Sequence, residues 1–238
     1  MTRTITAPAT HFGEGDSEPY ARALRTGSGT LTLRPETNPA MAGPVQFDVS
    51  SWCSDANLLE RSLLCSLQGP LLDVGCGPGR MLAAARSVGM SALGIDTSSE
   101  AVNRARGHGN RAIQQSVFAT VPHTGQWQSL LLLDGNIGIG GSISALLRRC
   151  RQLVAPTGVL LVEVEADTDL DISYTAVIED EEGNRSDAFG WARTGSAGLE
   201  SRTKSSGWTV SAKHHVQGRI FYRLVPRLEP RRYLRSIV

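Results

Sequence analysis

Between residues 71 and 164 the sequence alternates short apolar stretches with stretches whose apolar residues recur at helical spacing. Strands and helices that alternate in this way form a parallel sheet with right-handed helical crossovers. The pattern predicts strands at 71–74, 92–95, 112–118, 130–133 and 159–164, and helices near 79–88, 98–107 and 142–154. The sequence therefore predicts an α/β fold.

The segments on either side have a different texture. Leucines recur at helical spacing up to residue 67 and predict a helix from Asp55. Residues 13–50 carry scattered glycine and proline and predict an irregular N-terminal arm. Beyond about residue 171 the pattern is rich in β-strand, and its last two strands, around Gln217 and Gly218, predict an antiparallel hairpin.

Composition excludes several classes of protein. A chain of 238 residues with a net charge of +1 favours one domain without a general attraction to nucleic acid. We find neither a signal-peptide pattern nor an apolar run of the ~20 residues that a membrane span needs, so we expect a cytoplasmic protein with no membrane partner. The four cysteines show no pairing typical of zinc sites or disulfides. We expect a monomer or homodimer.

A glycine-rich turn follows the first predicted strand and opens the next helix. Gly75, Gly77 and Gly79 stand in the sequence Gly-Cys-Gly-Pro-Gly. Because glycine has no Cβ, such a turn lets a ligand contact the backbone directly. Asp96 ends the second strand, where a carboxylate can accept hydrogen bonds from both hydroxyls of a ribose. The turn and the acid together predict a nucleoside cofactor.

The turn is shorter than the one that binds dinucleotides. In that pattern the third glycine comes three residues after the second, where this chain has Arg80. A nicotinamide oxidoreductase is therefore disfavoured. Asp73, the compressed glycine turn and the Gly-Ile-Asp end of the second strand instead resemble motifs of class I S-adenosylmethionine-dependent methyltransferases.

This resemblance covers residues 55–165 and includes the Ala-Pro-Thr-Gly turn, in which Thr157 stands where the family commonly has glycine. It implies a Rossmann-like, mostly parallel sheet flanked by helices, closed by the antiparallel C-terminal hairpin. We expect residues 55–238 to form the methyltransferase domain and residues 1–54 to form an N-terminal arm or lid of the same domain.

The resemblance also implies S-adenosyl-L-methionine as cofactor. Many relatives place an Asp at the end of the third strand against the adenine, whereas this chain has Ser116 followed by Val117. A serine hydroxyl can still bond the ring edge, and Val117 can pack on the ring. The expected cofactor-binding residues are Asp73, Gly75, Cys76, Gly77, Gly79, Asp96, Thr97, Ser116, Val117 and Asp134.

The methyl acceptor should meet the loop 134–141, which follows the fourth predicted strand. In open α/β sheets ligands bind beyond the carboxyl ends of the strands. Asp134 and Asn136 are candidates to orient or deprotonate the acceptor, with His123, and behind it His214 and His215, as further candidate bases. Alternatively, Asp134 and Asn136 only form the turn.

We expect no metal, because the acidic residues after strands four and five do not match the ligand pairs of metal-dependent relatives. Basic patches interleaved with aromatic residues are absent, so a small-molecule acceptor is favoured over nucleic acid. The expected reaction is in-line methyl transfer to O or N of a small molecule, which we expect to be a secondary metabolite. The alternative is a protein of the same fold that binds the cofactor without methylating, as a cyclase, decarboxylase or ligand sensor.

Overall fold

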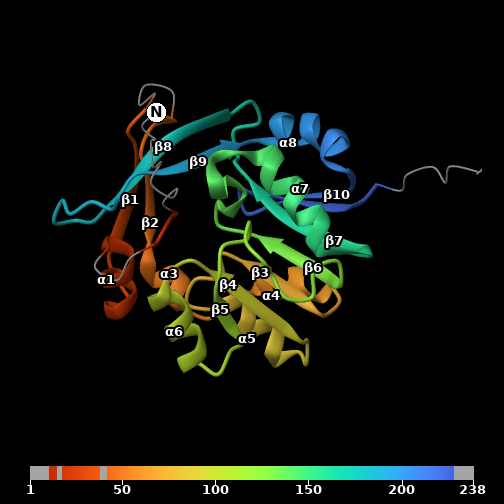
Figure 1. The fold of residues 1–238 in the computed structure, drawn as a ribbon, viewed down its shortest axis with the longest axis horizontal. Coiled ribbons are helices and arrows are strands. Elements are labelled where there is room, and N and C mark those ends of the chain that lie inside the picture. Colours follow the sequence, from red (N-terminus) through yellow and green to blue (C-terminus); the bar gives the residue numbers. More distant parts are fainter. Residues whose placement is uncertain (1–10, 15–17, 38–41, 228–238) are drawn as a thin grey trace, which may run out of the picture.

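A computed structural model describes residues 11–14, 18–37 and 42–227, which form two sheets and their flanking helices (Figure 1). The larger sheet has the strand order β10-β11-β7-β6-β3-β4-β5. Its strands are β3 (Leu71–Val74), β4 (Ala92–Asp96), β5 (Ala112–Gln114), β6 (Trp127–Leu132), β7 (Val154–Val164), β10 (Trp208–Val216) and β11 (Arg219–Pro226). Strands β3 to β7 pair in parallel, and β11 and β10 add antiparallel to β7. The predicted fold class is confirmed.

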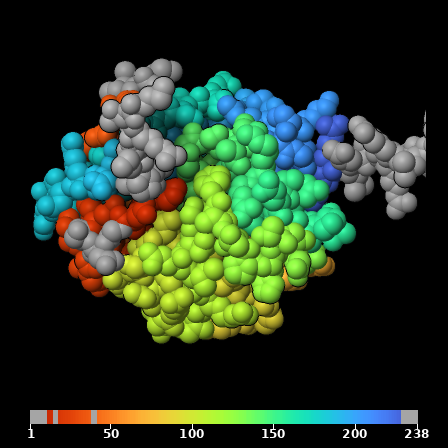
Figure 2. Space-filling model, viewed as in Figure 1, coloured from red at the N-terminus to blue at the C-terminus, as the bar shows by residue number. Residues whose placement is uncertain are grey.

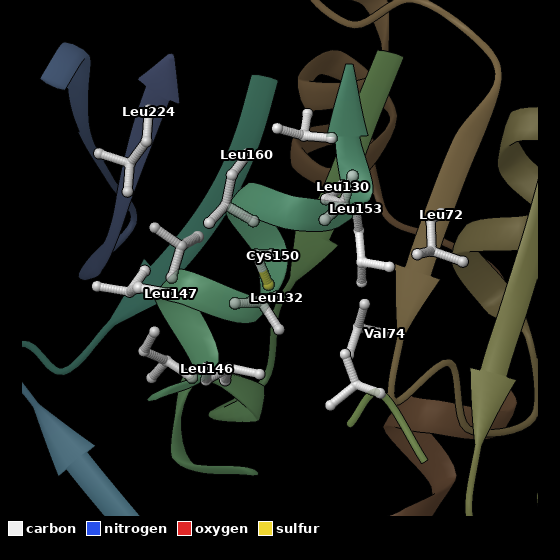
Figure 3. Packing of buried hydrophobic residues seen from close by; sticks show 14 of the residues in the cluster. Leu72, Val74, Leu130, Leu132, Leu146, Leu147, Cys150, Leu153, Leu160 and Leu224 are labelled. Atoms are coloured by element: carbon white, nitrogen blue, oxygen red, sulfur yellow. The ribbon is translucent and has the colours of Figure 1, made fainter. Parts of the chain in front are cut away.

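Successive side chains along each strand point to opposite faces of the sheet. Because apolar side chains occur on both faces, helices cover both. On one face Leu72, Leu130 and Leu160 pack with α7 (Ile143–Leu153) (Figure 3). On the other face the neighbouring residues Leu71, Leu131 and Leu161 pack with α4 (Leu58–Cys65) and α5 (Arg80–Ser87). Helix α6 (Ser99–Gly107) packs against α5. Strands buried on both faces explain the continuous apolar runs in the sequence.

Helix α7 follows the predicted apolar stripe. Leu146, Leu147, Cys150 and Leu153 are fully buried, and Ser142 caps the helix by accepting a hydrogen bond from the Ala145 N–H. Truncating one of these leucines to alanine would cost about 2–5 kcal/mol of unfolding free energy. In the described part of the chain, no helix is long and apolar enough to cross a membrane.

Several predicted boundaries were wrong; β6 begins at Trp127 and not at 130, and β7 begins at Val154 and not at 159. The helix expected from Asp55 begins at Leu58, because Asn57 and Glu60 form a reciprocal capping box with hydrogen bonds of 2.9 and 3.0 Å. The strand expected over 112–118 ends at Gln114, and Ser116 begins a turn instead.

The second sheet has the order β2-β1-β8-β9 and is antiparallel throughout. It joins β1 (Thr30–Pro35) and β2 (Val45–Asp48) to β8 (Asp171–Glu179) and β9 (Phe189–Thr194). The prediction of an irregular arm over 13–50 was therefore wrong, since buried leucines at 31 and 33 pack β1 on its distant partner. The red N-terminal elements and the cyan β8 region lie together beside the central elements (Figure 2).

Short helices complete the chain on both sides of these sheets. They are α1 (Pro19–Thr26), α3 (Val49–Cys53), η1 (Asn136–Gly141), α8 (Ser196–Thr203) and η2 (Lys204–Ser206). Helix α1 packs on α6 and so brings the N-terminal segment over the carboxyl end of the large sheet. This is where the parallel strands present the residues singled out in the sequence.

Candidate functional site

The glycine turn lies at the carboxyl end of β3 and is fixed to the neighbouring strand. Gly75, Gly77 and Gly79 have φ angles of 72, 52 and 92°, in the left-handed region that favours glycine. The N–H groups of Gly75 and Cys76 donate to the Ile95 carbonyl at 2.8 and 3.1 Å. A Cβ built on Gly77 would face Tyr20 Oη, 3.4 Å away, so a larger side chain would fill space that a ligand needs.

Two buried carboxyl groups flank this turn. Asp96 Oδ2 accepts a hydrogen bond from the Gly77 N–H, and Oδ1 accepts one from the Ser98 N–H, both at 2.9 Å. Burial raises the pKa of Asp96 to about 6, opposed by these backbone donors. Burial also raises the pKa of Asp73 to about 7, opposed by the nearby Arg80 charge. A cationic ligand beside these two groups would therefore stabilise their ionised forms and lower both pKa values.

A cleft with an empty volume of about 1040 Å³ opens over the turn. The predicted cofactor residues that line it are Asp73, Gly75, Cys76, Gly77, Asp96, Thr97, Ser116, Val117 and Asp134. Gly79 does not line the cleft. A Cβ there would lie 2.9 Å from Asn110 Nδ2 and 3.0 Å from Ala105 Cβ, so this glycine allows α5 to pack closely on α6.

The lining has the chemistry that S-adenosylmethionine requires. Each carboxylate oxygen of Asp96 has a further lone pair, so the group could accept ribose hydroxyls while it holds the turn. Ser116 and the buried Val117 lie in the same cleft and could contact the adenine. Asp73 could face the cationic methionine end. The bare backbone at Gly77 leaves room for a ligand at van der Waals distance.

Asp134 is bound into a network of five charged side chains. Its Oδ2 lies 2.6 Å from Arg80 Nη2, and its Oδ1 lies 3.1 Å from Arg219 Nη2. Glu60 Oε1 lies 2.8 Å from Arg80 Nη2 and 3.2 Å from Arg219 Nη1. Glu163 completes the network through a fork of two 2.7 Å hydrogen bonds to Arg219. Both carboxylate oxygens of Asp134 are therefore already engaged by cations.

Asn136 lies against the glycine turn. Its Nδ2 donates to the carbonyls of Val74 and Gly75 at 2.9 and 3.0 Å. A Cβ on Gly75 would come within 2.7 Å of that nitrogen. The residue lines the cleft, and its amide supports the turn from the adjacent loop.

The histidines predicted as candidate bases lie elsewhere. His123 is exposed and precedes β6, so it lies at the amino ends of the parallel strands, away from the glycine turn. Its ring packs edge-on against Trp127. His214 and His215 are exposed on the edge strand β10. None of these three histidines lines the cleft, so the structure does not bring them together with the other predicted site residues. All five histidines fall within the described ranges, and His11 alone lines the cleft.

Aromatic residues from distant segments form the outer wall of the cleft. Tyr20, Phe47 and Trp52 come from the N-terminal segment and Trp191 from β9. Phe12 was missed; its carbonyl accepts a 2.7 Å hydrogen bond from Thr97 Oγ1. Arg80, Glu60 and Arg219 were missed as site residues too, since charged residues so far apart carry no periodic signal.

A second cavity, with an empty volume of about 620 Å³, adjoins the first. Phe47, Asp134 and Trp191 line both. Its other lining residues are Leu33, Val45, Gly135, Ile137, Glu163, Val164, Glu165, Ala192 and Arg193. It thus lies between the second sheet and the carboxyl ends of β6 and β7.

Comparison with known proteins agrees with this geometry. A family described as a methyltransferase domain matches residues 50–192, more than half of the chain. Over 98 residues the chain is 33% identical to the trans-aconitate 2-methyltransferase of Paracidovorax citrulli, a match that covers 40% of this chain but only 38% of that relative.

Solved structures share the fold. A methyltransferase from Bacteroides fragilis, solved in complex with S-adenosyl-L-homocysteine, aligns over 92% of this chain and 99% of its own, with a TM-score of 0.76 and 20% identity. The Burkholderia thailandensis 1,6-didemethyltoxoflavin-N1-methyltransferase aligns over 72% of this chain and 78% of its own, with a TM-score of 0.52 and 15% identity. The chain belongs to the class I family of S-adenosylmethionine-dependent methyltransferases.

Proposed function

We propose that this protein transfers a methyl group from S-adenosylmethionine to a nitrogen or oxygen of a small molecule. The observation that carries the proposal is the continuity of the two cavities through Phe47, Asp134 and Trp191. One cavity contains the glycine turn and Asp96. The other adjoins it beside the carboxyl ends of β6 and β7, where an acceptor would meet the transferred methyl group.

The cofactor would supply an activated methyl group on a sulfonium sulfur, so the protein mainly has to align the acceptor and exclude water. Aromatic residues from both ends of the chain cover the cleft and support this role. Asp134 would orient the acceptor and not deprotonate it, because two arginines hold both of its oxygens. His11, the histidine in the cleft, is the candidate base.

The acceptor cavity favours a neutral or cationic acceptor, and an amine in particular. Three carboxylates, Asp134, Glu163 and Glu165, line it. Arg193 is already bound to Glu165 at 2.6 Å and to the Ala42 carbonyl at 2.8 Å. The paired groups around this cavity are four carboxylates, with Glu60 included, and the three arginines Arg80, Arg193 and Arg219, which leaves one excess negative charge. An anionic acceptor would therefore find no uncommitted cation in this lining.

A panel of small molecules tests both parts of the proposal. Purified protein and S-adenosylmethionine would be incubated with matched amines, phenols and carboxylic acids, and S-adenosylhomocysteine would be quantified. We expect turnover with amines and none with carboxylic acids. Preference for a carboxylic acid would contradict the acceptor class alone. Tight S-adenosylhomocysteine binding without turnover on any acceptor, cell extract included, would favour a non-methylating role.

We further propose that the N-terminal residues up to 54, as far as the structure describes them, act as a lid over the cleft. The support is the packing of Phe12, Tyr20 and Trp52 around one edge of the cleft. Hydrogen exchange should slow in α1 when S-adenosylhomocysteine binds, relative to α7, whose core is already buried. Equal exchange in α1 with and without ligand would contradict the lid.

A further inference from the structure

We infer that Arg219, at the start of the last strand, positions the cofactor turn through a relay of contacts that runs through Asp134 and Asn136. Arg219 does not line the cleft and lies beyond the residues that the family match covers. It acts as a positioning residue. The inference concerns the cofactor side of the site and is independent of which acceptor the enzyme takes.

The hairpin turn delivers Arg219 to the site. Gln217 and Gly218 both have positive φ angles, 53 and 78°, which reverse the chain tightly between β10 and β11. Ile220 then pairs with Val164, so β11 begins beside the carboxyl end of β7. The guanidinium consequently reaches the carboxyl ends of the parallel strands, where the cleft opens.

Arg219 holds Asp134 at two points. Directly, its Nη2 lies 3.1 Å from Asp134 Oδ1. Indirectly, its fork holds Glu163, whose Oε2 accepts a 2.9 Å hydrogen bond from the Asp134 backbone N–H. Side chain and backbone of Asp134 are thus both fixed by groups that depend on one guanidinium. Bidentate charge-assisted hydrogen bonds of this kind are strong and directional.

Asp134 needs such support because its backbone is strained. Its φ of 54° lies in the left-handed region, which non-glycine residues rarely adopt. Gly135 follows with φ of 83°, and the two residues together turn the chain out of β6. This turn brings Asn136 back over β3, where its amide bonds the Val74 and Gly75 carbonyls. Release of Asp134 would therefore loosen the contact that supports the cofactor turn.

The test is a double-mutant cycle on cofactor affinity. R219Q, N136A and the double variant would be compared by calorimetry with S-adenosylhomocysteine. Each single variant should bind about 10-fold more weakly, and the double variant little worse than either, because both changes break one relay. Residues that act independently would give a loss near 100-fold, the product of the two, and this result would overturn the inference.

Arg223 provides a matched control on the same strand. Its guanidinium contacts Ser211 outside the network, so R223Q should bind S-adenosylhomocysteine as the wild type does. R219K controls for the case in which R219Q loses affinity only because it is destabilised. Lysine keeps the positive charge but cannot form the two parallel hydrogen bonds to Glu163. We expect R219K to lose affinity several-fold at an unchanged melting temperature. Wild-type affinity in R219K, or a lower melting temperature with wild-type affinity in R219Q, would overturn the relay.

Discussion

The two sheets of this protein differ in how far apart in the sequence their paired strands lie. The parallel strands of the large sheet follow one another in sequence, and helices separate them everywhere except between β5 and β6. The strands β3, β4, β6 and β7 were visible as apolar runs. The second sheet joins β1 and β2 to β8 and β9, whose paired residues stand more than 130 positions apart. The first sheet presents the glycine turn and Asp96, and the second supplies Phe47 and Trp191 as the facing wall.

This difference separates two tasks. The cofactor side depends on backbone conformation, which local sequence dictates through glycine and strand pattern. The acceptor side depends on side chains that only distant pairing brings together. Substitutions in the two regions should therefore have separable effects, and the following predictions test this separation.

The largest effect should come from Gly75→Ala. The new Cβ would lie within 2.7 Å of Asn136 Nδ2 at a φ of 72°, so the turn must shift. We expect affinity for S-adenosylhomocysteine to fall at least ~100-fold, since the ligand must contact this backbone. Gly89→Ala is the matched control: its φ is 74°, but a Cβ there meets nothing within 4 Å. It should lose only about 1 kcal/mol of unfolding free energy and no affinity. Equal losses in both variants would mean that strain, and not the close contact, decides the effect.

The buried acid Asp73 should make stability depend on pH. Its folded pKa of about 7 lies above the unfolded value of 3.8, so the folded state binds a proton more tightly. The free energy of unfolding should therefore fall by up to a few kcal/mol as pH rises from about 4 to about 7.

Urea unfolding of the ligand-free protein at pH 5 and pH 7.5 measures this loss. Asp73→Asn should reduce it and leave the contributions of Glu18, Asp96 and Asp134, whose pKa values burial also raises. If Asp73→Asn keeps the full wild-type pH dependence, the pKa of Asp73 is not raised in the folded state and the prediction fails.

Asp96→Ala should weaken cofactor binding by about 1.5–3 kcal/mol, the value of a hydrogen bond to a charged acceptor. The variant also frees the Gly77 N–H, which the carboxylate holds at 2.9 Å. Calorimetry with S-adenosylhomocysteine checks the prediction. Asp96→Asn keeps one acceptor oxygen and should lose less. Unchanged affinity in the alanine variant would remove Asp96 from the cofactor site.

Truncation of one valine in each cavity should change either cofactor affinity or the KM for the acceptor several-fold, but not both. Val117 lines only the first cavity and Val45 only the second. Val117→Ala should weaken S-adenosylhomocysteine binding without raising KM for the acceptor, because each truncation removes apolar contact of about 1 kcal/mol or slightly more. Val45→Ala should do the reverse. If either variant changes both quantities equally, the two cavities act as one.

Removal of divalent metal should have the smallest effect. Asp134 and Glu163, two acidic residues at the carboxyl ends of β6 and β7, are bound to Arg219. Turnover in excess EDTA should therefore equal turnover in buffer. A loss that Mg²⁺ restores would contradict the prediction and return these carboxylates to a metal site.

The sequence by itself determined the alternating α/β core, the stripe of α7, and the positions of Gly75, Gly77 and Asp96. These features are local: apolar periodicity selects the element, and a missing Cβ selects the turn. Only the tertiary structure decided that residues 30–35 and 45–48 are strands and that Glu60, Arg80, Asp134, Glu163 and Arg219 form one network. Pairing between remote strands and ion pairs between remote side chains leave no periodic trace, because the free energy that selects them arises only once the chain is folded.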